Sequence, residues 1–199
     1  MARLFAFRAR FSGYSGNRDG SAAVPTDNQE AYKPAEIAAL IETAGVGKAA
    51  LPLHRMATLA LLAGAFIGFG SAFWCMAMVG ADPGFGPQRV LGGAVFALGL
   101  ILVVVGGAEL FTGNALMVMA AVDRRITLGA LLRNWGIVYL GNLIGAVGLA
   151  VAFGLTGLLD GPMGAVAAKA ASAKASLPPL EAFMRGALCN ALVCLAVWL

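Results

Sequence analysis

Long apolar runs separated by short polar segments dominate the chain after residue 55. A helix that crosses a membrane needs about 20 mainly apolar residues. Four segments satisfy this requirement, namely 56–80, 90–122, 128–159 and 180–199. The pattern therefore predicts an all-α membrane protein whose transmembrane domain covers residues 56–199 and crosses the bilayer four times.

The second run contains a polar, glycine-rich interruption at 106–114, Gly-Gly-Ala-Glu-Leu-Phe-Thr-Gly-Asn. Lipid cannot hydrogen-bond an opened backbone, so such a break must be packed in protein or line a wet cavity. Discontinuous membrane helices are typical of substrate pathways. We therefore predict that 90–122 is a broken helix, unwound around Leu110–Thr112 at the depth of the bilayer. The alternative, a tight turn outside the membrane, is disfavoured because neither flank carries the expected Lys or Arg.

The segment before the first crossing is more polar. Residues 1–30 contain several arginines and predict a disordered cytoplasmic tail, with a faint similarity to an organelle-targeting peptide as the alternative. Within 31–55, the apolar residues Ile37, Leu40 and Ile41 recur at helical spacing. This spacing predicts an amphipathic helix that lies at the membrane interface.

Composition and charge agree with membrane insertion. Hydrophobic residues make up 60% of the chain and charged residues 12%, which lies far outside the range of soluble proteins. Basic residues gather in the N-terminal tail and at Arg124 and Arg125, so the positive-inside rule predicts a cytoplasmic N-terminus, with 157–179 facing outward. Because topology explains the net charge of +4, the lipid bilayer is the expected partner and no nucleic acid is needed.

The reactive residues give no support for an enzyme. His54 is the only histidine, and the three cysteines lie inside predicted crossings without metal-ligand spacing. We therefore expect no catalytic residues, no cofactor and no metal. The pairs Gly64/Gly68 and Gly141/Gly145 instead predict faces where helices approach closely in lipid.

Three segments closely resemble motifs of the formate/nitrite transporter family. They are Gly107-Ala-Glu-Leu-Phe-Thr-Gly-Asn114, Asn134-Trp-x-x-x-Tyr-x-Gly-Asn142 and Arg185-Gly-Ala-Leu-Cys-Asn190-x-Leu-Val-Cys-Leu-Ala-Val-Trp198. The stretch Tyr32-Lys-Pro-Ala-Glu36 is also similar to members of that family. The motifs are long, occur in the family's order and fall on three predicted crossings, and the resemblance covers about residues 31–199.

The resemblance implies an aquaporin-like helical bundle with a broken second helix, in which four of the family's six transmembrane helices are present before Leu199. It also implies a homopentamer in the cell inner membrane, in which each protomer carries a pore for small monovalent anions such as formate or nitrite. The family's fifth and sixth helices, with their central histidine, have no counterpart in this sequence. Two functions therefore stay open, anion transport and a non-conducting truncated remnant or accessory membrane subunit.

The resemblance further implies roles for single residues. Phe96 and Leu100 match an apolar pore constriction, although both could be ordinary core residues. The gating loop corresponds to Leu110, Phe111 and Thr112, the polar pore residue to Asn190, and the vestibule lysine to Lys174, which could equally be a solvated surface charge. Because a carboxylate repels anions, we expect Glu109 to anchor the helix as a hydrogen-bond acceptor instead of contacting substrate.

Overall fold

The computed structural model describes residues 32–82 and 85–198, and all regular secondary structure within these ranges is helical. The α-helices are α2 Pro34–Ala49, α3 Leu53–Ala77, α4 Gly86–Gly106, α5 Phe111–Asn114, α6 Val118–Val122, α7 Leu128–Leu155, α8 Pro162–Ala175 and α9 Pro179–Trp198, with one 3-10 turn, η1 Ala115–Met117, between α5 and α6. The prediction for residues 1–30 lies outside the described residues.

Four helices, α3, α4, α7 and α9, are long and apolar enough to cross a membrane in the described part of the chain. They contain 25, 21, 28 and 20 residues. At 1.5 Å per residue even the shortest extends about 30 Å, the thickness of the hydrocarbon core of a bilayer. The predicted all-α membrane fold with four crossings is confirmed. The bounds differ slightly, because α3 begins at Leu53 and α7 ends at Leu155.

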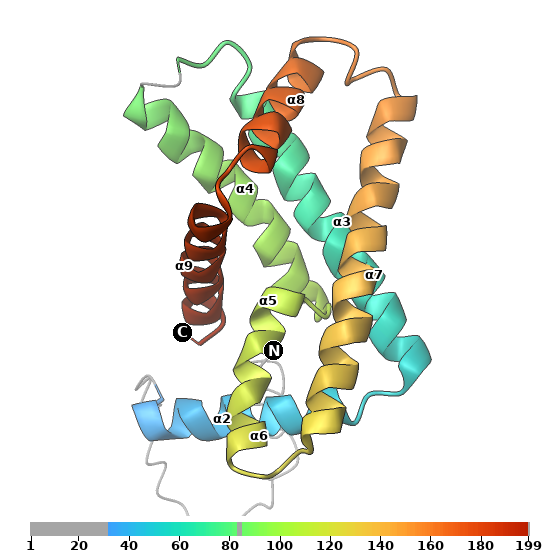
Figure 1. The fold of residues 1–199 in the computed structure, drawn as a ribbon, viewed down its shortest axis with the longest axis vertical. Coiled ribbons are helices and arrows are strands. Elements are labelled where there is room, and N and C mark those ends of the chain that lie inside the picture. Colours follow the sequence, from blue (N-terminus) through green and yellow to red (C-terminus); the bar gives the residue numbers. More distant parts are fainter. Residues whose placement is uncertain (1–31, 83–84, 199) are drawn as a thin grey trace, which may run out of the picture.

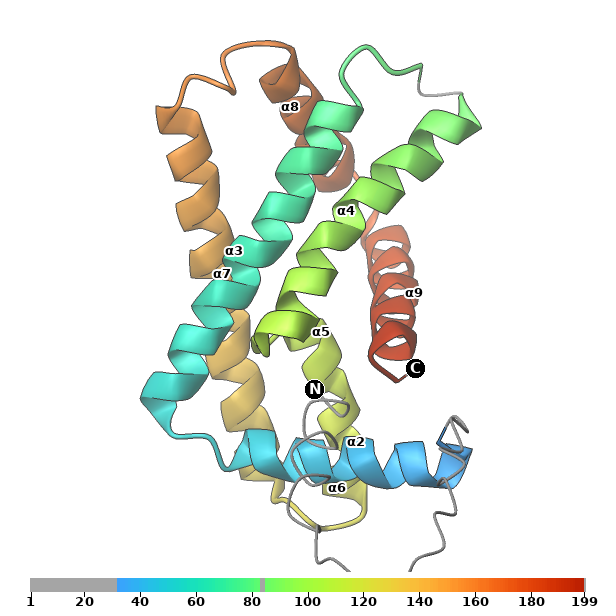
Figure 2. The same cartoon turned by 180° about the vertical axis from the view of Figure 1, so that it is seen from behind.

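Two of the long helices, α4 and α7, pack against α3 (Figure 1). One face of α3 contacts α7 and another contacts α4, while α9 lies beside the broken helix and contacts α5. Figure 2 shows the same arrangement from behind, with α2 lying across one end of the bundle, nearly perpendicular to the long helices. At that end α2 packs on η1, α6 and α7.

Glycines allow α3 and α7 to approach closely, as their spacing predicts. A Cβ atom at Gly64 would overlap the backbone of Asn142, and one at Gly145 would overlap the carbonyl of Leu61. The same holds between α3 and α4, where a Cβ at Gly70 would lie 2.7 Å from the Phe96 carbonyl oxygen. Close backbone contact of this kind stabilises helix pairs in lipid, where apolar burial contributes little.

The second crossing is broken between α4 and α5, about halfway along the bundle in Figure 1. Gly107 ends α4 with φ +65°, and the amides of Gly107 and Ala108 donate to the carbonyls of Val104 and Val103 at 3.4 and 2.9 Å. This pair of bonds is a Schellman motif, which needs a residue that tolerates positive φ. The predicted broken helix is therefore present, but the non-helical residues are 107–110, and the predicted unwinding of Phe111 and Thr112 is wrong because both begin α5.

The segment 157–179 contains a helix, α8, that the hydrophobic pattern did not predict. Pro162 occupies its first turn, and alanines fill much of its length. Proline is favoured in the first turn of a helix, and alanine has the highest helix propensity of all residues. The segment is too short and too polar to be recognised as a crossing, but it packs on α3 and covers one end of the bundle.

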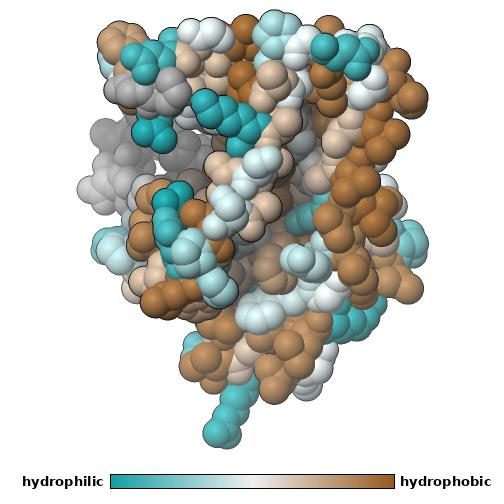
Figure 3. Space-filling model, turned by 45° about the horizontal axis from the view of Figure 1, so that its top comes forward, coloured by the Kyte–Doolittle hydropathy of each residue, from teal (hydrophilic) through white to brown (hydrophobic). Residues whose placement is uncertain are grey.

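The outward faces of the long helices are apolar, as contact with lipid requires. On α7 the exposed large hydrophobic side chains are those of Leu128, Leu132, Tyr139, Leu140, Leu143, Ile144, Val147, Val151 and Leu155. Figure 3 shows hydrophobic residues covering the side of the molecule along which α7 lies in Figure 1. Such a surface is expected of a multi-pass membrane protein, in which lipid or another protein covers these faces.

Candidate functional site

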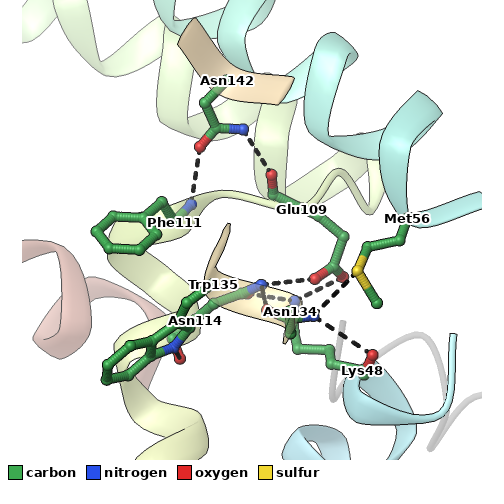
Figure 4. Close-up of polar contacts among 8 residues, drawn as sticks. All are labelled: Lys48, Met56, Glu109, Phe111, Asn114, Asn134, Trp135 and Asn142. Carbon is green, nitrogen blue, oxygen red and sulfur yellow. Dashed lines mark hydrogen bonds and ion pairs between the residues drawn. The ribbon is translucent and has the colours of Figure 1, made fainter. Parts of the chain in front are cut away.

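A buried carboxylate lies at the break. The Glu109 side chain is only 1% exposed. Its Oε1 accepts a hydrogen bond from the Lys48 ammonium at 2.7 Å, and its Oε2 accepts one from the Asn114 amide at 2.7 Å (Figure 4). An unpaired buried charge is costly, so these two donors make the ionised form of Glu109 tolerable at this depth. The expectation that Glu109 anchors the helix as an acceptor is confirmed.

Lys48 lies in the last turn of α2. In the sequence it precedes the first crossing, whereas Glu109 follows it. The Lys48 ammonium also donates to the Asn114 Oδ1 at 2.9 Å, and its side chain is 21% exposed. The helix at the end of the bundle is therefore joined directly to the break and to the end of α5. The sequence pattern gave no indication of this contact, because 61 residues separate Lys48 from Glu109.

Helix α7 completes the polar cluster. Asn134 accepts a hydrogen bond from the Asn114 amide at 2.8 Å, and its own amide lies 3.4 Å from the Lys48 carbonyl oxygen and 3.8 Å from the Met56 sulfur. The Trp135 indole donates to the Asn114 carbonyl at 3.0 Å. Glu109, Asn114 and Asn134 are all fully buried, so the cluster satisfies its own polar groups without solvent.

Asn142 satisfies the backbone that the break leaves open. Its Oδ1 accepts a hydrogen bond from the Phe111 amide at 2.8 Å (Figure 4). Its Nδ2 donates to the carbonyls of Ala60 at 2.8 Å and Glu109 at 2.9 Å. The Phe111 amide begins α5 and has no partner inside that helix. One side chain on α7 therefore ties α3, the break and the start of α5 together.

Two further α7 side chains support the first residue of α5. The Phe111 ring meets the Trp135 and Tyr139 rings edge to face, with centroids 6.1 and 5.4 Å apart. The Phe111 and Tyr139 rings border an apolar groove of about 280 Å³ between α3 and α7, lined by Gly64, Ile67, Leu110, Phe111, Tyr139, Asn142, Leu143 and Ala146. Two of the three predicted gating residues therefore border this side of the break.

The other predicted pore residues lie on the opposite side, toward α9. Leu100 lines a second groove of about 260 Å³ with Ala97, Ile101, Val104, Val105 and Ala196. The Thr112 carbonyl oxygen lies 3.5 Å from the Cys194 sulfur on α9. On the same helix the buried Asn190 Oδ1 has no hydrogen-bond partner among the described residues. Leu100 and Thr112 thus lie where α9 meets the broken helix, and Asn190 lies on α9.

Phe96 and Lys174 are less enclosed. Phe96 is 37% exposed and, although one turn from Leu100, it does not line the second groove. Lys174 is exposed near the end of α8. Neither Phe96 nor Lys174 lines either of these two grooves. Within the described residues no group of three or more His, Cys, Asp or Glu side chains could hold a metal.

Comparisons with known proteins agree on one family. The sequence profile described as formate/nitrite transporter matches residues 35–199. The formate channel FocA of Escherichia coli K12 is 41% identical over 170 residues, which cover 83% of this chain and 60% of FocA. This chain therefore spans less than two thirds of the length of that relative.

Two solved structures resemble the fold. A protein described as an FNT family ion channel superposes with a TM-score of 0.73 at 26% identity, over 82% of this chain and 67% of that one. A pentameric formate channel with formate bound superposes with a TM-score of 0.68 at 39% identity, over 73% of this chain and 59% of that one. Both similarities extend over most of the described helices.

Proposed function

Because this chain belongs to the formate/nitrite transporter family, we propose that it carries small monovalent anions, formate or nitrite, across a membrane. The observation that carries this proposal is the break between α4 and α5, which Glu109, Lys48 and Asn142 hold open inside an apolar bundle. A backbone interrupted at this depth is tolerated where it is packed in protein or lines a cavity, and discontinuous membrane helices are typical of substrate pathways. The relatives described as formate channels support formate, and the family description supports nitrite.

The proposed path runs along the face where α9 meets the broken helix. Leu100, with Phe96 one turn before it, forms an apolar constriction that opposes the passage of water and bare ions. Asn190 and Thr112 offer hydrogen bonds to the anion beside it. The Asn190 Oδ1 has no hydrogen-bond partner among the described residues, which supports a separate role as an acceptor for a passing donor such as water or the protonated acid.

Gating is assigned to Leu110, Phe111 and Thr112. Leu110 precedes α5 and borders the groove between α3 and α7, whereas the Thr112 carbonyl contacts α9. A small shift of this segment would therefore change both sides of the break together. The Trp135 and Tyr139 rings contact the Phe111 ring edge to face and would restrain such a shift.

Lys174 is the proposed vestibule residue. Its exposed ammonium lies on α8, at the end of the bundle away from α2. A positive charge at the mouth of a path raises the local concentration of anions without binding them tightly.

We also propose a homopentamer in the cell inner membrane, with the N-terminus cytoplasmic and α2 at the membrane interface. A solved structure described as a pentameric formate channel supports the assembly. The positions of Arg124 and Arg125 at the same end as α2 support the orientation, because basic residues favour the cytoplasmic side.

Reconstitution into proteoliposomes tests the proposal. We expect formate and nitrite to equilibrate across vesicles that contain the chain and not across empty vesicles. The variant Leu100→Trp tests the path itself. The larger tryptophan side chain should fill the second groove and abolish flux, while the helical content of the protein is preserved. A chain with native helical content that passes neither anion would refute the proposal and favour a non-conducting membrane subunit.

A further inference from the structure

Two arginines at the end of the bundle near α2 have no acidic partner in the described part of the chain. Arg55 lies in the first turn of α3, and Arg133 lies in the second turn of α7. Both are exposed. The ion pairs found among the described residues involve other basic groups, namely Lys48, Arg125 and Arg185. Within the described residues, Arg55 and Arg133 are therefore the arginines of the crossing helices at this end that carry an unpaired positive charge.

The two arginines lie at a similar depth. Met56 and Asn134, the residues that directly follow them, contact each other through the Met56 sulfur and the Asn134 amide at 3.8 Å. At 1.5 Å per residue, Arg133 lies about 7.5 Å along α7 from its first residue, Leu128. An arginine at that position can extend its long apolar stem along the helix and carry the guanidinium to the lipid headgroups.

Each arginine also begins an exposed apolar stripe. On α3 the residues at helical spacing from Arg55 are Leu62, Phe69, Phe73 and Met76, and all four are exposed. On α7 the corresponding exposed residues after Arg133 are Leu140, Ile144, Val147 and Val151. A cationic group at the membrane surface, followed by an apolar stripe whose first half spans one leaflet, matches the charge and shape of an anionic phospholipid.

We propose that α3 and α7 bind anionic phospholipid, with headgroup phosphates at Arg55 and Arg133 and acyl chains along the two stripes. Guanidinium groups bind phosphate through paired hydrogen bonds. An acyl chain fits an apolar helix face, and basic residues beside a membrane crossing favour anionic over zwitterionic lipid. Lipid binding at this surface requires only that the chain is inserted in a membrane or detergent micelle. Its test is therefore independent of anion transport.

Native mass spectrometry of the purified chain in detergent, with equal amounts of phosphatidylglycerol and phosphatidylcholine added, tests the proposal. We expect the parent chain to retain phosphatidylglycerol in preference to phosphatidylcholine. The double variant Arg55→Gln/Arg133→Gln should lose this preference, by about fivefold for each arginine, the factor that corresponds to about 1 kcal/mol per basic residue near the surface. Arg89→Gln is the matched control, since Arg89 is exposed in the first turn of α4 at the opposite end and its loss should leave the preference unchanged.

Circular dichroism establishes that each variant is folded, and the single variants Arg55→Gln and Arg133→Gln replace the double variant should it not fold. The lysine variant Arg55→Lys/Arg133→Lys keeps the charge and should retain more phosphatidylglycerol than the glutamine variant. An unchanged preference in the glutamine variants would overturn the proposal. So would a change in the mass of the protein assembly without a change in bound lipid, because a second copy of the chain would then cover this surface.

Discussion

The Lys48 ammonium lies 2.7 Å from the Glu109 carboxylate, although 61 residues separate the two in sequence. The contact joins the last turn of α2 to the unwound residues between α4 and α5. It lies in the interior, since Glu109 is fully buried and Lys48 is mostly so. The position of α2 and the shape of the break are therefore fixed by the same ion pair.

Lys48→Met should destabilise the fold strongly. The substitution leaves the Glu109 carboxylate buried without a counter-charge, and loss of one partner of a buried pair typically costs about 3–5 kcal/mol. Lys48→Met/Glu109→Gln removes both charges and should recover part of that loss. Chemical unfolding in mixed micelles, followed by circular dichroism, measures the difference in the free energy of unfolding.

Arg125→Met is the control for this ion pair. Arg125 pairs with Glu42 at 3.3 Å, but its side chain is 42% exposed, and exposed pairs contribute about 1 kcal/mol or less. If Lys48→Met costs no more than Arg125→Met, the buried pair does not hold the break in place.

Asn142→Leu should loosen the start of α5 specifically. The leucine removes the acceptor for the Phe111 amide and the donors to the Glu109 and Ala60 carbonyls. Each buried backbone group left without a partner costs about 1–3 kcal/mol. Hydrogen exchange should therefore become faster at the Phe111 amide than at the amide of Val138, which lies in the middle of α7.

Asn142→Asp separates the two functions of this side chain. An aspartate keeps an acceptor for the Phe111 amide and loses both donated bonds. Phe111 should then stay more protected from exchange than in Asn142→Leu. Equal acceleration at Phe111 and Val138 in the leucine variant would instead show that the loss is global.

Gly145→Ala should destabilise the contact between α3 and α7, because the added methyl group would overlap the Leu61 carbonyl. Overpacking of this kind costs about 1–3 kcal/mol. Gly148→Ala is the matched control one turn further along α7, where no atom lies within 4 Å of the added Cβ. Thermal unfolding in detergent should show a lower midpoint for Gly145→Ala alone, and equal midpoints would exclude close packing as the role of Gly145.

The crossings and the break were predictable because they depend on local sequence. Runs of apolar residues fix the crossings, and the glycines and Glu109 fix the interruption. The exact unwound residues were missed because Gly107 sets them by accepting a positive φ, a signal that the Gly106–Gly107 pair carries but the hydrophobic pattern does not.

The contacts that hold the site together were harder to predict from the sequence. Lys48 contacts Glu109 only because α2 lies across the end of the bundle, against η1, α6 and α7. The position of Lys48 in the sequence does not indicate where α2 lies. Asn142 was recognised as part of a motif, but its three bonds depend on how closely α3 and α7 approach. Long-range packing decides these partners, whereas local periodicity decides the helices.

Lys174→Glu should slow formate uptake into proteoliposomes if Lys174 attracts anions to the outer end of the path. Reversal of one exposed charge changes the local anion concentration, so we expect a reduction of about twofold to tenfold in the initial rate at low ionic strength. The reduction should shrink at about 1 M salt, where the Debye length falls to about 3 Å. Lys169→Glu makes the same charge change on the same helix and is the control, since Lys169 is also exposed. A rate that falls equally in both variants would mean that the overall charge of α8, and not the position of Lys174, governs uptake.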